Sequence, residues 1–306
     1  MHIRKKEEHK MKKSAFVLAA ALAAMTLSSV SAVEPGGAKG TAEFKFGVAG
    51  YTFNKKNLDE TLKTLKDIDA HYLCVKDFHL KQDCTQEEAD AFKEKLAKAG
   101  VQAVAVGPVY NDSEASLRRA FEWAKKLGVK VVVGIPLEHR DTGAVDKNGK
   151  PKRENVESDA MLDLVDKLVK EYDMCYAIHN HGPDMPNLYP NADAAMKRIG
   201  NRDKRIGLCL DIGHEFRFGF NACDSIRKYG DRIYDVHLKN VSSPNKAGHA
   251  MQLPRGAMDL VDVAKALKEV GYKGVLHLEY ERDFEDNALG LAECIGYYRG
   301  IVDSLR

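Results

Sequence analysis

From residue 44 onward, short runs of β-forming apolar residues alternate with longer stretches in which apolar residues recur every three or four positions. The longer stretches predict helices, for example at 86–99 and 114–127, and Gly100, Gly128 and Gly271 follow predicted helices as C-terminal caps. This alternation is typical of an α/β protein with a parallel sheet. The short runs predict eight strands, at 44–51, 71–78, 101–107, 129–135, 174–180, 205–212, 232–239 and 274–280.

Eight consecutive strand–helix units predict a single (β/α)8 TIM barrel over residues 44–306. The length of this region suits such a barrel, which usually needs about 250 residues. An open doubly wound sheet is the alternative, but no glycine-rich phosphate-binding turn follows the first predicted strand. A barrel places its active groups at the carboxyl ends of its strands and in the loops that follow. Two of those loops, 137–155 and 241–256, are long.

Residues 1–32 have the layout of a cleavable secretory signal peptide. Two lysines precede an apolar run at 15–27, and a group of small residues ends at Ala32. Because the run is too short to span a bilayer comfortably, we expect cleavage after Ala32 and no stable membrane insertion of the cleaved protein. A buried N-terminal helix is the alternative. We expect a flexible tether at 33–43 and export of the protein, into the periplasm if the source is Gram-negative.

Composition narrows the possible partners. Of the 306 residues, 44% are hydrophobic and 30% are charged, which excludes a disordered chain. The net charge of +2 comes from 47 basic and 45 acidic residues, and loss of residues 1–32 would leave a slightly acidic protein. Nucleic-acid binding depends on clustered lysine and arginine, so we expect no nucleic-acid partner. No pattern in the sequence specifies an oligomeric state.

The six cysteines form no close pairs along the sequence, and three of them lie inside predicted strands. We interpret them as small buried hydrophobic residues rather than a disulfide framework, although an exported chain could oxidise a pair that the sequence does not identify. They are Cys74, Cys84, Cys175, Cys209, Cys223 and Cys294.

Predicted strands five to eight each end with a side chain that can bind a divalent cation: His179, Asp211, His237 and Glu279. The ends of adjacent strands converge in a barrel. Two imidazoles and two carboxylates form a mixed nitrogen and oxygen set that suits one Mn²⁺, Co²⁺, Zn²⁺ or Mg²⁺ ion. A hydrogen-bonded barrel residue is the simpler interpretation of any one histidine, but four such side chains at consecutive strand ends favour a metal site.

Further polar residues near these strand ends are candidates for proton transfer or substrate binding. His181 and Lys76 are candidate catalytic residues beside Glu279, since each could hold a substrate hydroxyl or move a proton. Support of a metal ligand, or a solvated strand end, is an equally simple interpretation. The candidate substrate-binding residues are His214, Lys239, His249, Arg255 and His139.

The sequence resembles the xylose-isomerase-like TIM-barrel superfamily, which contains sugar isomerases, ketose 3-epimerases, inosose dehydratases and the endonuclease IV branch. The resemblance covers nearly all of the chain after the leader. It is carried by Leu-Asp-Ile-Gly-His on strand six, Val-His-Leu-Lys-Asn on strand seven and Leu-Glu-Tyr on strand eight. It implies metal-binding roles for Asp211, His237 and Glu279, and a substrate-contacting role for His214.

Strand five departs from the superfamily pattern, because the epimerase branch carries a glutamate where this chain has His179. The resemblance implies that the two glutamates of that branch exchange protons with opposite faces of the sugar. A metal-bound imidazole has no free lone pair on its coordinating nitrogen, whereas a carboxylate can bind metal with one oxygen and accept a proton with the other. His179 can therefore replace the ligand but cannot easily replace the base.

This difference favours one reaction type. Proton removal next to a carbonyl needs a metal and one base, for which Glu279 is the candidate, and expulsion of a leaving group then needs only an acid. Epimerisation needs reprotonation from the other face, for which His181, His139, Glu138 or Lys76 could still act. We therefore expect a metal-dependent lyase or hydratase acting on a keto-sugar or 3-keto-glycoside.

Three alternatives remain open. The first is a sugar isomerase or epimerase that interconverts unphosphorylated or phosphorylated ketoses, and the second is a non-catalytic sugar-binding protein of the cell envelope. The third is an endonuclease, which the charge balance does not favour. A small neutral carbohydrate is the favoured substrate, because an exported protein meets few phosphorylated sugars and the sequence has no glycine-rich phosphate cradle.

Overall fold

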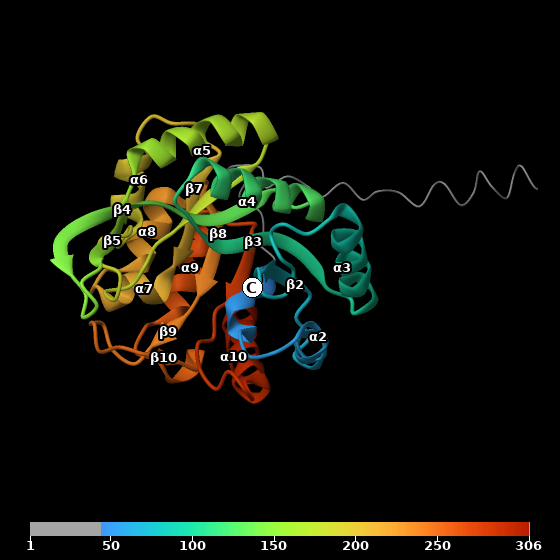
Figure 1. The fold of residues 1–306 in the computed structure, drawn as a ribbon. Coiled ribbons are helices and arrows are strands. Elements are labelled where there is room, and N and C mark those ends of the chain that lie inside the picture. The colour runs from blue at the N-terminus through green and yellow to red at the C-terminus, as the bar shows by residue number, and fades with distance from the viewer. Residues whose placement is uncertain (1–43, 306) are drawn as a thin grey trace, which may run out of the picture. The chain divides into compact units, whose positions relative to one another are not determined.

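The computed structural model describes residues 44–305, and the predicted signal peptide at 1–32 and tether at 33–43 lie outside these residues. Eight parallel strands form a closed ring, because β1 pairs with β11 and β3 pairs with β4 (Figure 1). The ring confirms the predicted single eight-stranded α/β barrel and excludes the open sheet. Its strands are β1 (Lys45–Ala49), β2 (Tyr72–Val75), β3 (Gln102–Asn111), β4 (Val131–Val145), β6 (Cys175–His179), β7 (Ile206–Asp211), β8 (Ile233–Leu238) and β11 (Val275–Leu278).

Helices lie around the outside of the ring, and their apolar faces pack against it (Figure 1). Side-chain caps fix the start of several of them: Asn57, Thr85 and Ser113 each accept a hydrogen bond from the backbone three residues later. The helices are α2 (Leu58–Asp67), α3 (Gln86–Lys98), α4 (Glu114–Leu127), α5 (Asp159–Tyr172), α6 (Ala192–Ile199), α7 (Ile212–Arg217), α8 (Ala222–Tyr229), α9 (Leu260–Glu269) and α10 (Ala288–Ser304).

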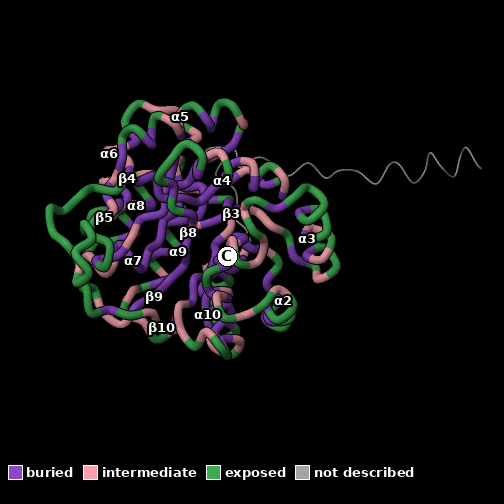
Figure 2. Tube along the Cα trace, in the orientation of Figure 1, coloured by how far each residue is buried: buried purple, intermediate pink, exposed green. Residues whose placement is uncertain are grey.

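Burial follows the predicted pattern of buried strands and amphipathic helices. Figure 2 shows the strands buried at the centre and the outer helix faces exposed. In α4, for example, Leu117, Phe121 and Ala124 are fully buried, as their helical spacing predicts. All six cysteines are free thiols, and five of them are buried. Among the described residues, the helices are too short or too polar to cross a membrane.

The polar stretch expected to be a loop at 137–155 is instead a β-hairpin, so that prediction was wrong. β4 continues to Val145 and pairs with the antiparallel strand β5 (Pro151–Glu157). Asp146 closes the turn, since its Oδ1 accepts hydrogen bonds from the backbone N–H groups of Asn148 and Lys150. Both faces of the outer hairpin are exposed, which removes the apolar alternation that would have identified it as two strands.

The second long loop, 241–256, contains two short antiparallel strands and a single helical turn. The strands are β9 (Asn240–Val241) and β10 (Ala250–Met251), and the 3-10 turn spans Leu253–Arg255.

β3 extends four residues beyond its predicted end at Gly107. The prediction stopped there because proline is unusual inside a sheet, yet the strand continues past Pro108 to Asn111. Its pairing with β4 shifts register between Val106 and Val109, which accommodates the irregularity. The extension matters for the site because it includes Tyr110.

Candidate metal centre

Four side chains meet where four adjacent strands end. His179 is the last residue of β6, Asp211 is the last residue of β7, His237 lies in β8 and Glu279 directly follows β11. One potential ligand atom from each lies within 4.8 Å of those from the other three. We call these four residues the ligand cluster. All four are at most 4% exposed, and strand pairing sets Asp211 directly beside His237.

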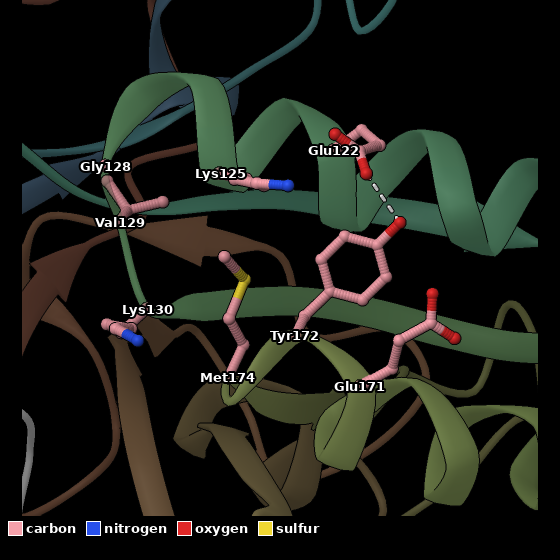
Figure 3. A pocket seen from close by; sticks show the side chains of 8 residues that line it. All are labelled: Glu122, Lys125, Gly128, Val129, Lys130, Glu171, Tyr172 and Met174. Atoms are coloured by element: carbon pink, nitrogen blue, oxygen red, sulfur yellow. Dashed lines mark hydrogen bonds between the residues drawn. The ribbon is translucent and has the colours of Figure 1, made fainter.

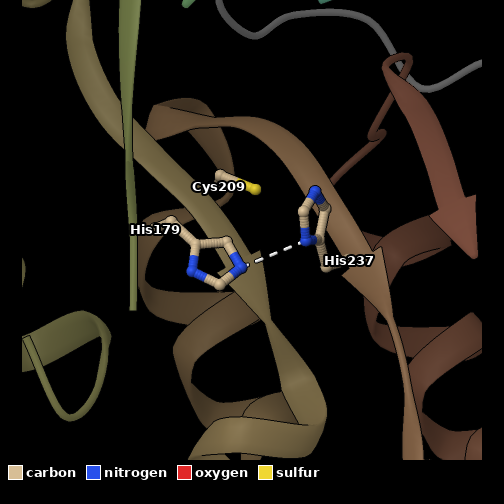
Figure 4. A group of neighbouring side chains, drawn as sticks. All are labelled: His179, Cys209 and His237. Carbon is tan, nitrogen blue, oxygen red and sulfur yellow. Dashed lines mark hydrogen bonds between the residues drawn. The ribbon is translucent and has the colours of Figure 1, made fainter. Parts of the chain in front are cut away.

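The ligand cluster has separations that suit a single ion. His237 Nδ1 lies 3.1 Å from His179 Nε2 and 3.2 Å from Glu279 Oε2. Figure 4 shows the hydrogen bond between the two imidazole rings, with Cys209 beside them. Asp211 Oδ2 and Glu279 Oε2 lie 3.7 Å and 4.0 Å from His179 Nε2. Bond lengths of about 2.0–2.2 Å to a divalent ion imply ligand separations of about 2.8–3.6 Å, which the observed distances match or slightly exceed.

The local fold presents one oxygen of Asp211 to the ligand cluster. Asp211 Oδ1 accepts a hydrogen bond from the backbone N–H of His214 and so caps α7, which leaves Oδ2 facing His179. Asn180 fixes the backbone of Asp211 with two hydrogen bonds between β6 and β7. Asp211 is therefore held with Oδ2 toward the ligand cluster.

Lys239 supplies a buried positive charge beside the ligand cluster. Its Nζ lies 2.9 Å from Asp211 Oδ2, 2.8 Å from Glu279 Oε2 and 3.0 Å from Glu281 Oε2. Burial opposes a charge on this amine, but the three carboxylates outweigh burial and raise the pKa of Lys239 well above its ordinary value. The lysine stem packs against Gly213, where a Cβ atom would lie 2.7 Å from Lys239 Cγ.

The charges of the carboxylates and histidines depend on one another. Burial raises the pKa of Asp211, and Glu279 raises it further, whereas Lys239 and His237 outweigh burial at Glu279 and hold its pKa well below the ordinary value. Burial keeps the pKa of His179 low, so this imidazole is neutral as a metal ligand must be. Burial also opposes charge on His237, but Glu279 and Asp235 raise the pKa of His237 to about 9. A bound ion would replace that proton.

A second buried pair lies next to the ligand cluster in the barrel. His277 Nδ1 donates to Asp235 Oδ1 at 2.6 Å, and both side chains are almost completely buried. Neither residue is among the candidates predicted from the sequence. The alternation of Asp235 with His237 along β8 could have singled out Asp235, but no signal in the sequence pairs it with His277 of β11.

A line of aromatic rings leads from the ligand cluster to the solvent-exposed mouth of the barrel. The ring centroid of His181 lies 5.3 Å from that of His179 and 5.4 Å from that of His214. Tyr110, which is 44% exposed, stacks on His181, and its hydroxyl lies 2.7 Å from His181 Nε2. Burial lowers the pKa of His181 to about 4, so this ring is neutral at physiological pH. Sequence reasoning identified His181 and His214 but missed Tyr110.

The model of the family described as "Xylose isomerase-like TIM barrel" matches residues 62–299, which is more than half of the chain. The chain belongs to this family. An inosose dehydratase from Lacticaseibacillus casei is 24% identical to it over 210 residues, covering 62% of this chain and 70% of that protein.

Two solved structures share the fold of this chain. The IOLI protein with a bound zinc atom has a TM-score of 0.65 at 20% identity, over 85% of this chain and 99% of that one. A D-tagatose 3-epimerase-like protein has a TM-score of 0.64 at 17% identity, over 86% and 99% of the two chains. At these identities the two structures establish the fold alone.

The remaining predicted site residues of this xylose-isomerase-like chain contact other partners. Lys76 Nζ forms an ion pair with Asp77 at 2.9 Å. The other three candidates, His139, His249 and Arg255, form no described hydrogen bond or ion pair with the ligand cluster. His139 contacts Asn155 and Asp112, His249 contacts Ser242, and Arg255 pairs with Glu293 of α10. Their substrate-binding roles stay predictions.

Figure 3 shows a groove between α4 and α5 that lies away from the ligand cluster. It is lined by Gly128, Val129 and Lys130, which precede β4, and by Met174, which precedes β6. The groove is therefore at the amino-terminal ends of the strands, whereas catalytic groups of TIM barrels lie at the carboxyl ends.

Proposed function

We propose that the protein is a divalent-metal-dependent carbohydrate enzyme that removes a proton next to a carbonyl and then expels a leaving group. Its substrate is a keto-sugar or a 3-keto-glycoside, which makes it a lyase, or a hydratase in the reverse direction. The observation that carries this proposal is the ligand cluster, in which Glu279 is a buried carboxylate beside Lys239 and strand five contributes His179.

The residues present fit a metal ion in donor type, separation and burial. The ligand cluster would hold the ion, which would polarise the substrate carbonyl when bound. Glu279 is the candidate base, because Lys239 keeps this buried carboxylate ionised and ready to accept a proton. The ammonium group of Lys239 also lies where it can stabilise negative charge that develops on the substrate.

His179 supports elimination over epimerisation. A neutral imidazole that donates its lone pair to a metal has no site left on that nitrogen to accept a proton from carbon. With one base in the ligand cluster, the enediolate formed by proton removal is most simply consumed by loss of a group from the neighbouring carbon. The dehydratase relative is named for a reaction of this class, the elimination of water.

The substrate we propose is neutral rather than phosphorylated. Export of the protein, which we infer from the layout of residues 1–32, would separate it from the cytosolic pool of sugar phosphates. Arg255, the loop residue most able to hold an anion, is paired with Glu293 through both ends of its guanidinium fork.

The proposal is tested by incubating metal-loaded protein with a 3-keto-glycoside and following the products by mass spectrometry. We expect release of the aglycone and an unsaturated or hydrated keto-sugar, with no product from chelator-treated protein. Intact substrate with every divalent metal tried would contradict the proposal.

A sugar isomerase or epimerase is the second candidate, and the epimerase-like structural neighbour favours it. It predicts incorporation of solvent deuterium into a recovered ketose. The sugar would have an inverted stereocentre or a shifted carbonyl group, and it would keep all of its substituents. A third candidate, a sugar-binding protein without activity, predicts sugar binding that chelators do not change.

A further inference from the structure

We propose that Tyr110 is the general acid that protonates the departing oxygen of the substrate. This inference rests on the proposed lyase function and names the residue that completes it. The elimination needs a base for the carbon-bound proton and an acid for the leaving group, and the ligand cluster with Glu279 provides only the first.

Tyr110 is placed between the ligand cluster and solvent. It lies near the end of β3 and is linked to His179 through the stacked ring of His181. A sugar ring held at the ligand cluster would therefore extend its leaving group toward the Tyr110 hydroxyl.

The hydrogen bonds of Tyr110 leave its proton available. A phenol has one proton to donate and can also accept, so its oxygen can accept from the Nε2–H of His181 while its own proton points elsewhere. The other neighbour of this hydroxyl is Met185 Sδ at 3.6 Å, and a thioether is a weak acceptor. A leaving oxygen is a far better acceptor and would replace Met185. His181 acts as a positioning residue for the Tyr110 hydroxyl.

The bonds and protons of the step balance without an oxidant or reductant. For a 3-keto-glycoside, Glu279 takes the proton from C2, and the electron pair of that bond forms the enediolate. The enediolate then re-forms the C3 carbonyl while a C1–C2 double bond forms and the C1–O bond breaks. Tyr110 gives its proton to the departing oxygen, and the phenolate is held by the hydrogen bond from His181 until it regains a proton from solvent. Glu279 then releases the proton taken from C2 to solvent, so that both groups return to their starting states.

Other candidate acids near the mouth are engaged by other groups. Lys76 is paired with Asp77, and His139 lies between Asp112 and Asn155 on the hairpin. Lys239 is held among three carboxylates, where its pKa is raised and its proton is held tightly. Tyr110 differs from these side chains in the tautomer of His181 that carries its hydrogen on Nε2, because the phenol proton then has only the thioether of Met185 as a neighbouring acceptor.

The test compares two leaving groups in Tyr110→Phe and in a matched control. The substrates are the ethyl and the 4-nitrophenyl 3-keto-glucosides of the same anomeric configuration. A nitrophenolate departs without help, whereas an ethoxide needs a proton as it leaves. Tyr51→Phe is the control, because Tyr51 is similarly exposed and packs on Phe284. Thermal unfolding shows whether each variant is folded.

We expect Tyr110→Phe to lower kcat/KM about 10²-fold for the ethyl glycoside and by less than about threefold for the nitrophenyl glycoside. Tyr51→Phe should change neither. Equal losses on the two substrates, or no loss on the ethyl glycoside, would overturn the role of Tyr110. Failure of the unmodified protein to cleave either substrate would overturn the proposed lyase function, and this inference with it.

Discussion

At the scale of single residues, the chemistry depends on which of two buried carboxylates beside one ammonium group stays ionised. Lys239 lies within 3 Å of an oxygen of both Asp211 and Glu279, yet the pKa of Glu279 falls while that of Asp211 rises. The difference arises because His237 hydrogen-bonds Glu279 and adds to the effect of Lys239 there. Glu279 is therefore the carboxylate that stays ionised and can act as the base.

Replacement of Glu279 tests this assignment. Glu279→Gln keeps the shape and one ligand oxygen but removes the proton acceptor. We expect retained folding and most of the metal affinity, with turnover lowered about 10²–10⁴-fold. Steady-state kinetics together with metal analysis of the purified variant measure both quantities. A near-normal rate would exclude Glu279 as the base.

Replacement of His179 tests the one-base account. His179→Glu supplies a second carboxylate that can bind metal with one oxygen and accept a proton with the other. We expect solvent deuterium to enter a recovered ketose with inversion in this variant, and not in the unmodified protein. If the unmodified protein already epimerises the sugar, the distinction drawn from His179 is wrong.

At the scale of elements, the short helix α7 connects the ligand cluster to the surrounding helices. Asp211 caps its first turn, and Gly213 in that turn gives the stem of Lys239 room to pass. Glu215 on the same helix accepts hydrogen bonds from the backbone of Ala192, where α6 begins, and from Ser225 in α8. α7 therefore sets the positions of Lys239 and of two neighbouring helices.

A methyl group at Gly213 should displace Lys239 without removing any charge. In Gly213→Ala the new Cβ would lie within 3 Å of three stem carbons of Lys239, so the ammonium group must move from the carboxylates. We expect turnover to fall about tenfold or more while the protein still binds a divalent ion. Unchanged kinetics, with a crystal structure showing Lys239 in place, would contradict this role.

Glu215 should make stability depend on pH. Burial raises its pKa to about 7 from an ordinary value of 4.5, so the folded protein holds a proton there that the unfolded chain releases. Its contribution to stability is complete below about pH 4.5 and is lost as pH rises through about 7, an effect of about 3 kcal/mol. In Glu215→Gln this dependence should disappear. Chemical unfolding of both proteins across this range measures it, and parallel curves would contradict the assignment.

The elements also show which parts of the fold the sequence can specify. Within the barrel wall the eight strands are largely buried, so each appears as an apolar run that could be located from the sequence. The β4–β5 hairpin is exposed on both faces and carries no such run. β3 was cut short because Pro108 normally ends a strand, and Tyr110 was missed with it.

At the scale of the whole molecule, closure of the barrel assembles residues that are distant along the chain. His179 and Glu279 are separated by 100 positions, and the order of the strands brings them within 4.0 Å. The ligand cluster could be anticipated because strand ends in a barrel converge. Lys239 and His181 were identified as candidates, but their contacts depend on side-chain directions across the barrel, and sequence does not give these. Glu281 and the Asp235–His277 pair were missed for the same reason.

The central claim is that the four residues of the ligand cluster bind one divalent ion together. Calorimetric titration of chelator-stripped protein with Mn²⁺ or Zn²⁺ tests it most directly, with Asp211→Asn as the variant and Tyr51→Phe as the control. We expect one ion per chain in the unmodified protein and the control, and affinity at least about 100-fold weaker in Asp211→Asn. Absence of binding to the unmodified protein, or equal affinity in a folded Asp211→Asn variant, would contradict the account.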